Sequence, residues 1–196
     1  DSPMRSMIMT FLVVLCAFTG AEAMAANIII DHTNATAWDN VSASVRAEAM
    51  KLRCYFTHAS VGGNLMGGLS DLRDSDAALY PMQSSSDDAN PPSTTTQGTF
   101  YEYNRGNPGA ASKITVFANC VANGWRFPKV DVAINKFCYI DQTASWDDYR
   151  TSMTTLEATY PETIFVYVTI PLKTDDNSQA GLQRHQFNEN LRNWID

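Results

Sequence analysis

The sequence predicts an α/β fold in which a parallel β-sheet lies between two layers of helices. Residues 28–30 and 164–170 are nearly continuous apolar runs, which are typical of parallel strands covered on both faces. Strand-like and helix-like segments alternate along the chain, and repeated strand–helix–strand units with right-handed crossovers build such a sheet. With 196 residues, 44% of them hydrophobic, the chain can bury one sizeable core, whereas two domains would be a tight fit.

The first half of the chain contains predicted strands at 27–32, 54–57 and 99–104 and predicted helices at about 38–52, 61–72 and 112–123. The second of these helices has apolar residues at helical spacing, and its four glycines permit close packing against a sheet. Residues 83–98 are rich in Ser, Thr, Asp and Pro, so they are expected to form an exposed, mobile loop.

The second half contains predicted strands at 130–140 and 164–170. The helix between them begins after Ser145, which makes a capping-box-like pair with Asp148, and Pro161 ends it. The last helix, from about Ser178, is expected to bury its apolar residues and to turn His185, Asn188 and Arg192 outward.

Residues 1–25 are expected to be a signal peptide with upstream residues, and 26–196 the folded domain. A short apolar stretch follows Arg5, and an A-x-A cleavage site follows the stretch. The apolar stretch is too short for a membrane span, which needs about 20 apolar residues. We therefore expect a secreted or periplasmic protein that has no membrane partner once the signal is removed.

Export would place Cys54, Cys120 and Cys138 in an oxidising compartment where disulfides persist. Because three is an odd number, the simplest arrangement is one bridge and one buried thiol. Cys54 lies in an apolar strand, so the predicted bridge joins Cys120 to Cys138.

The composition argues against several classes of function. The formal net charge is −7, the pI is near 4.8 and no Lys/Arg cluster stands out, so a nucleic-acid partner is not expected. No His or Cys spacing typical of a metal site occurs, so neither a metal nor another cofactor is assigned. Nothing in the sequence indicates an oligomeric state.

Ser60 is the candidate nucleophile. It lies between a short aromatic strand and a helix that begins with two glycines, a junction that holds a hydroxyl rigidly beside backbone N–H groups able to bind an oxyanion. Gly62 would let the chain turn tightly and let substrate approach the backbone. The alternative is that the Ser60 side chain caps the following helix, and the two roles are compatible.

Four segments resemble the SGNH/GDSL hydrolase superfamily: residues 27–33, 55–64, 131–141 and 165–172. The resemblance spans nearly all of the chain after the predicted signal. It implies a flavodoxin-like three-layer α/β/α sandwich and hydrolysis of acyl esters, often on carbohydrates, with Ser60 as nucleophile. His58-Ala59-Ser60 stands where the common superfamily pattern has Gly-Asp-Ser.

The resemblance also implies an oxyanion hole built from the serine N–H, a glycine N–H from a later loop and an asparagine side chain. The glycine is Gly106 or Gly109, and the asparagine candidates are Asn64 and Asn107. The superfamily's catalytic histidine follows the last strand, and no matching motif occurs before Asp196. Either the C-terminal part is missing, or His58, His32 or His185 substitutes. The alternative for His58 is a structural histidine that bonds to the turn or lines the pocket.

The sequence therefore leads to two functional hypotheses. The first is a secreted serine esterase that acts on acyl, including acetyl, esters of small molecules or carbohydrates. The second is a non-catalytic extracellular module on the same fold that binds carbohydrate or another partner without a working triad.

Overall fold

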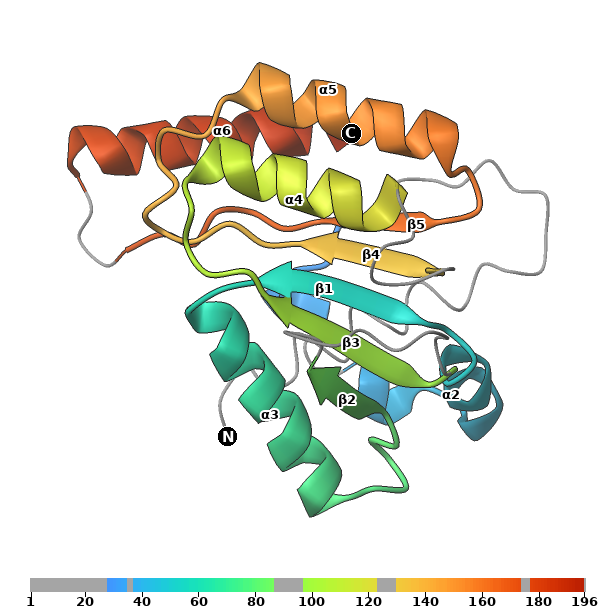
Figure 1. Cartoon of the computed structure of the whole chain (residues 1–196). Helices are drawn as coiled ribbons and strands as arrows, with labels where there is room; N and C mark the ends of the chain where they lie inside the picture. Colours follow the sequence, from blue (N-terminus) through green and yellow to red (C-terminus); the bar gives the residue numbers. More distant parts are fainter. Residues whose placement is uncertain (1–27, 35–36, 87–96, 123–129, 174–176, 196) are drawn as a thin grey trace.

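Five parallel strands form one sheet in the order β2-β3-β1-β4-β5, which confirms the predicted fold class (Figure 1). The computed structural model describes residues 28–34, 37–86, 97–122, 130–173 and 177–195. The strands are β1 (Cys54–His58), β2 (Gln83–Ser86), β3 (Thr99–Asn104), β4 (Val132–Asn135) and β5 (Ile164–Tyr167).

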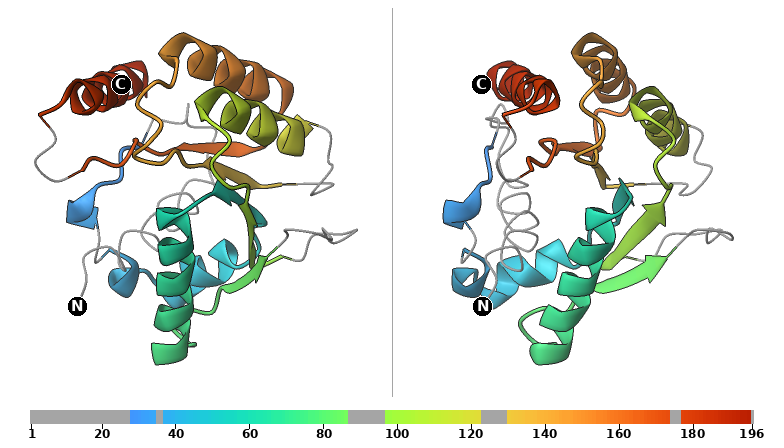
Figure 2. Two further views of the ribbon diagram at one scale, coloured as in Figure 1. Left: turned by 60° about the vertical axis from the view of Figure 1, so that its left-hand side comes forward. Right: turned by 90° about the vertical axis from the view of Figure 1, so that its left-hand side faces the viewer.

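Helices cover both faces of this sheet, consistent with a three-layer sandwich. One side carries α4, α5 and α6, and the other carries α2 and α3 (Figures 1 and 2). Their bounds are α2 (Ala43–Ala49), α3 (Val61–Ser75), α4 (Ala110–Ala122), α5 (Trp146–Thr159) and α6 (Gln179–Ile195), with short 3-10 helices at His32–Asn34 and Trp38–Asn40.

The central strand β1 is buried along its whole length and contributes to a separate core on each face. Successive side chains of a strand point to opposite faces, so Phe56 packs on the α3 side and Tyr55 on the α4 side. Tyr55 stacks parallel to Phe117 of α4, with ring centroids 6.4 Å apart. Because both faces of β1 are covered, the position of its carboxyl end is fixed from two sides.

The strand predicted at 27–32 is wrong. Within the described residues, Ile28 and Ile29 are 39% and 53% exposed and pair with no strand. The polar residues that follow fold locally instead: the Thr33 N–H and hydroxyl both donate to Asp31 Oδ1. An apolar triplet forms a buried strand only when a neighbouring strand can pair with it. The sheet described here consists of β1 to β5 and does not include residues 28–30.

Several predicted elements are shorter or divided. The helix predicted at 38–52 is interrupted at Val41 and Ser42, where Ser42 Oγ accepts from Val45 N–H and starts α2. The strand predicted at 130–140 ends at Asn135. The start of the predicted loop 83–98 is the edge strand β2, and residues 87–96 lie outside the described residues.

Asn188 is buried rather than exposed on α6. Its side chain accepts from the Ile170 N–H at 2.7 Å and donates to the Ile170 carbonyl at 2.9 Å. The Asn188 side chain therefore bonds both backbone groups of Ile170, as a neighbouring strand would, in the segment just beyond β5.

The predicted Cys120–Cys138 disulfide is wrong, because Cys54, Cys120 and Cys138 are buried cysteines that form no disulfide. Cys120 belongs to the buried face of α4, whereas the Cys138 thiol donates to the Ala59 carbonyl at 3.5 Å. A cysteine count alone does not decide which cysteines meet, and here Cys120 and Cys138 lie in different surroundings.

None of the described helices is long and apolar enough to cross a membrane. The signal peptide predicted at residues 1–25 lies outside the described residues.

Candidate functional site

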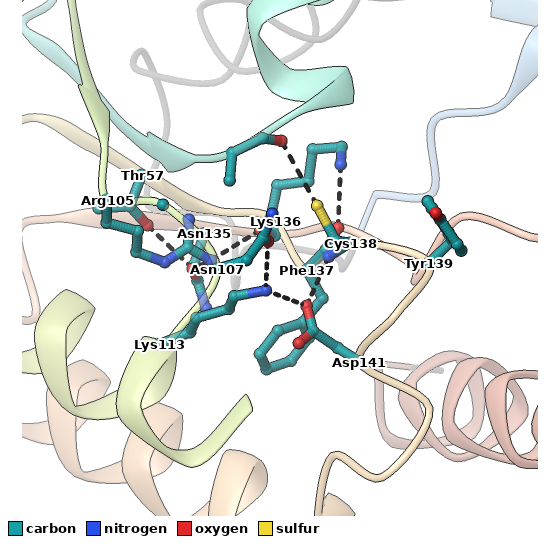
Figure 3. A network of polar contacts seen from close by, with 12 residues as sticks. Thr57, Arg105, Asn107, Lys113, Asn135, Lys136, Phe137, Cys138, Tyr139 and Asp141 are labelled. Carbon is teal, nitrogen blue, oxygen red and sulfur yellow. Dashed lines mark hydrogen bonds and ion pairs between the residues drawn. The ribbon is translucent and has the colours of Figure 1, made fainter. Parts of the chain in front are cut away.

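The candidate site lies at the carboxyl edge of the sheet, where the loops after β1 and β3 diverge. The loop after β1 enters α3 on one face, and the loop after β3 enters α4 on the other (Figure 1). In doubly wound sheets such a divergence leaves a crevice at the carboxyl ends of the strands. The residues between β4 and α5 meet the other two loops at the same edge (Figure 3).

Ser60 has a strained backbone. Its φ of 51° and ψ of −114° make it the only non-glycine residue with positive φ among the described residues. Such a conformation costs about 1–3 kcal/mol and persists only where the surroundings enforce it. Here the Gly62 N–H donates to the Ala59 carbonyl and the Gly63 N–H to the Ser60 carbonyl.

The Ser60 side chain is exposed and does not cap α3, so the capping alternative raised by the sequence is not observed. The strained turn thus presents the hydroxyl to solvent rather than using it to satisfy the helix. A serine nucleophile at a strand-to-helix turn needs a hydroxyl that is exposed in this way.

Gly62 packs directly on the His58 imidazole. A Cβ added at Gly62 would lie 2.3 Å from His58 Cβ and 2.5 Å from Nδ1, closer than real side chains approach one another. The first turn of α3 can therefore rest on the ring only because position 62 has no side chain. The sequence analysis assigned Gly62 to the turn, but its contact with His58 needed the structure.

His58 is paired with Glu102, a residue that sequence reasoning missed. His58 Nε2 lies 2.6 Å from Glu102 Oε2, and the ring stacks on Phe56. Burial lowers the pKa of His58, and Arg105 and Lys136 lower it further, whereas Glu102 raises it. The neutral ring therefore donates Nε2–H to the carboxylate, and its buried Nδ1 has no hydrogen-bond partner. Neither nitrogen is bonded to Ser60.

A polar network joins the ends of β1, β3 and β4. Asn135 Oδ1 accepts from the Thr57 hydroxyl at 2.9 Å and from Arg105 Nη2 at 3.1 Å, and Arg105 Nη2 also donates to the Lys136 carbonyl at 2.8 Å (Figure 3). The Arg105 N–H donates to the His58 carbonyl at 3.0 Å. The loop after β3 is thereby tied to both neighbouring strands.

A buried ion pair, Lys113–Asp141, orients Asn107. Lys113 Nζ lies 2.6 Å from Asp141 Oδ2 and 2.8 Å from Asn107 Oδ1, and Asp141 Oδ2 also accepts the Cys138 N–H at 2.7 Å (Figure 3). Lys113 and Asp141 are 0% and 2% exposed. Because ammonium can only donate, the oxygen of Asn107 faces Lys113 and its NH₂ group faces away.

The remaining candidates are distributed over two loops. Asn64 is exposed in the first turn of α3, on the same turn as Ser60 and Gly62. Gly106 and Gly109 have φ values of 69° and 74° in the loop that carries Asn107, and both have open space around them. His185 is exposed on α6, and the side chain of His32 is not described.

Sequence reasoning missed the half-buried Glu102 and the buried polar residues of this edge, namely Arg105, Lys113, Asn135, Lys136 and Asp141. One signal could have found some of them: Arg105 directly follows β3 and Lys136 directly follows β4. Polar residues at the carboxyl ends of adjacent parallel strands meet at one edge.

Comparison with family models, with curated proteins and with solved structures found no match. Among the described residues, no group of three or more His, Cys, Asp or Glu side chains is placed to hold a metal ion.

Replacing Gly62 with Ala should destabilise the protein by about 1–3 kcal/mol, because the new methyl group overlaps the His58 ring. Gly63→Ala is the matched control. No atom lies within 4 Å of a Cβ at Gly63, so this change should be neutral or stabilising by about 0.5–1 kcal/mol. Urea denaturation measures both, and equal effects would contradict the Gly62–His58 contact.

Asp141→Asn should cost about 3–5 kcal/mol of unfolding free energy, because it leaves the buried Lys113 ammonium without its counter-charge. Glu48→Gln is the control, since Glu48 forms an exposed pair with Lys51 and should contribute less than about 1 kcal/mol. Chemical denaturation at neutral pH distinguishes the two. A small effect at Asp141 would mean that water reaches Lys113.

Folding stability should fall as pH drops below the ordinary histidine pKa of 6.5. The pKa of His58 is lowered in the folded state, so the unfolded chain takes up its proton first, and the contribution of the neutral ring is lost as pH falls through the folded pKa. His58→Gln should flatten this part of the curve, whereas His185→Gln should leave it unchanged. Urea midpoints measured between pH 7.5 and pH 5 would show the difference.

Proposed function

We propose that this protein is a serine hydrolase of acyl esters with Ser60 as its nucleophile. The observation that carries the proposal is the strained, exposed Ser60 at the turn between the central strand and α3. Strained residues cluster at functional sites, and an exposed serine at the carboxyl edge of a parallel sheet is well placed to act as a nucleophile. Ser60 Oγ would attack the ester carbonyl, the alcohol would leave, and water would release the acid.

Two groups support stabilisation of the oxyanion. The N-terminus of α3 directs its partial positive charge toward the Ser60 turn. The Asn107 NH₂ group, turned outward by Lys113, is a donor held in one orientation. A hydrogen-bond donor that is already oriented stabilises the oxyanion more than a donor that must first reorganise. Asn64, in the first turn of α3, and Gly109, in the loop that carries Asn107, are the proposed substrate contacts.

His58 is the proposed base. Glu102 holds its Nε2–H in the way that the carboxylate of a triad holds histidine, so Nδ1 remains as the proton acceptor. The lowered pKa keeps this nitrogen unprotonated at neutral pH. Gly62 lies against Nδ1, so proton transfer from Ser60 requires a shift of the first turn of α3 or a bridging water.

The proposal extends to the type of hydrolase. The segments that resemble the SGNH/GDSL superfamily and the predicted secretion signal favour a secreted or periplasmic esterase, with acylated carbohydrate as a substrate class. The α/β fold with its parallel sheet is compatible with that superfamily.

The second candidate is a non-catalytic binding module on this fold. The observation in its favour is that His58 is bonded to Glu102 and not to Ser60. In that case the exposed Ser60, Asn64 and Asn107 would bind a polar ligand, and no turnover would follow.

A fluorophosphonate probe should label the protein at Ser60, and Ser60→Ala should abolish both labelling and hydrolysis of short-chain p-nitrophenyl esters. The control is Ser75→Ala, at the far end of the same helix, which should retain both. Mass spectrometry of the labelled peptide identifies the residue. Labelling that survives in Ser60→Ala would identify another nucleophile, and ligand binding without labelling or turnover would favour the binding module.

A further inference from the structure

His58 is buried with one ring nitrogen that has no hydrogen-bond partner. The residue is 1% exposed, its ring stacks on Phe56, and its Nε2 lies 2.6 Å from Glu102 Oε2. Nδ1 is buried without a partner, and Gly62 packs beside it, where an added Cβ would lie 2.5 Å away. An unprotonated nitrogen tolerates this position, because it has no hydrogen to donate.

A second proton on the ring changes this balance, because Nδ1–H would be a buried charged donor without an acceptor. Burial lowers the pKa of His58 most, and Arg105 after β3 and Lys136 after β4 lower it further, whereas Glu102 on β3 raises it. The first turn of α3, residues 61–64, carries no titratable side chain. The imidazolium would therefore be much more stable if water reached Nδ1.

The first turn of α3 is the element whose movement would admit that water. Two backbone hydrogen bonds close the turn, from the Gly62 N–H to the Ala59 carbonyl and from the Gly63 N–H to the Ser60 carbonyl. The strained backbone of Ser60, with its φ of 51°, works against them. Lifting the turn from the ring would let Ser60 relax, which offsets part of the cost of the two broken hydrogen bonds.

We propose that His58 and Gly62 form an acid-sensitive switch that opens the Ser60 turn. At neutral pH the uncharged ring supports the first turn of α3 and keeps Ser60 strained. When Nδ1 takes up a proton, the turn lifts from the ring, water reaches the nitrogen and Ser60 leaves its positive φ. The sheet stays folded, because β1 pairs with β3 and β4 through residues 54–58, which precede the turn.

The pH range of the switch follows from the two environments of the ring. In the closed state burial lowers the pKa of His58, whereas in the open state the ring meets water and its pKa returns toward the ordinary value of 6.5. The open state therefore binds the proton more tightly, and opening becomes easier as pH falls below 6.5. One proton can raise the opening constant by at most about tenfold per pH unit.

Amide hydrogen exchange of the protein labelled with ¹⁵N-glycine, followed by NMR between pH 7.5 and pH 5, tests the switch. After correction for the intrinsic exchange rate at each pH, exchange at Gly62 and Gly63 should rise about tenfold as pH falls to 5. Gly67 and Gly68, further along the same helix, are the internal controls and should not change. An equal rise at all four glycines, or no rise at Gly62 and Gly63, would overturn the proposal.

Two pairs of variants assign the response to this contact. His58→Gln should abolish the acid-dependent rise, whereas His185→Gln, on the exposed face of α6, should retain it. If His58→Gln does not fold, Gly62→Ala replaces it: the added methyl group displaces the turn, so exchange at Gly63 should already be fast at pH 7.5 and respond little to acid. Gly63→Ala should leave the response of Gly62 intact. A response that persists unchanged in folded His58→Gln or in Gly62→Ala would refute the switch.

Only the consequence of the switch for activity rests on the proposed function, since an esterase would lose the position of its nucleophile when the turn opens. Fluorophosphonate labelling at the same pH values separates the two proposals. Acid-dependent exchange without labelling at any pH refutes only the esterase. Labelling of Ser60 without acid-dependent exchange at Gly62 and Gly63 refutes only the switch.

Discussion

The contact between Gly62 and the His58 ring is the constraint on which the whole carboxyl edge depends. It sets how closely α3 approaches β1, and the three residues between His58 and Gly62 have to close the turn. Ser60 takes up the resulting strain as a positive φ. His58 can serve as this support because it is held from the other side by Glu102 and stacked on Phe56. Any change that enlarges position 62 or frees the ring therefore relaxes the serine.

The polar groups of this edge are fastened by a few shared acceptors. Asn135 Oδ1 links β1 to the loop after β3, and Asp141 links α4 to the loop after β4. Because each of these oxygens accepts from two donors, a few side chains hold together the loops after β1, β3 and β4. If one of these acceptors is removed, more than one buried donor loses its hydrogen bond. The loss of stability is then larger than for a single hydrogen bond.

The sequence was sufficient to predict the parallel α/β architecture and the place of Ser60, because period and residue type determine both locally. The strand at 54–57, the α5 cap at Ser145 and the end of that helix before Pro161 all follow such local rules. The sequence-based predictions failed where the structure depends on contacts between residues far apart in the chain. The triplet at 28–30 has strand composition but no strand beside it, and Cys120 and Cys138 have the right count for a bridge but separate environments. Glu102 and Asp141 became visible as site residues only when pairing across the sheet brought them to His58 and Lys113.

The order in which the sheet is assembled has a consequence for synthesis on the ribosome. β1 pairs with β4 through contacts that span 78 residues, including Arg53 with Asp131 and Thr57 with Asn135, and the Cys138 thiol reaches back 79 residues to Ala59. At about 5–20 residues per second, these partners emerge roughly 4–16 s after the serine has been made. During that interval nothing on the β4 side holds the turn. The strained conformation of Ser60 is thus acquired late, when most of the chain that surrounds it has been synthesised.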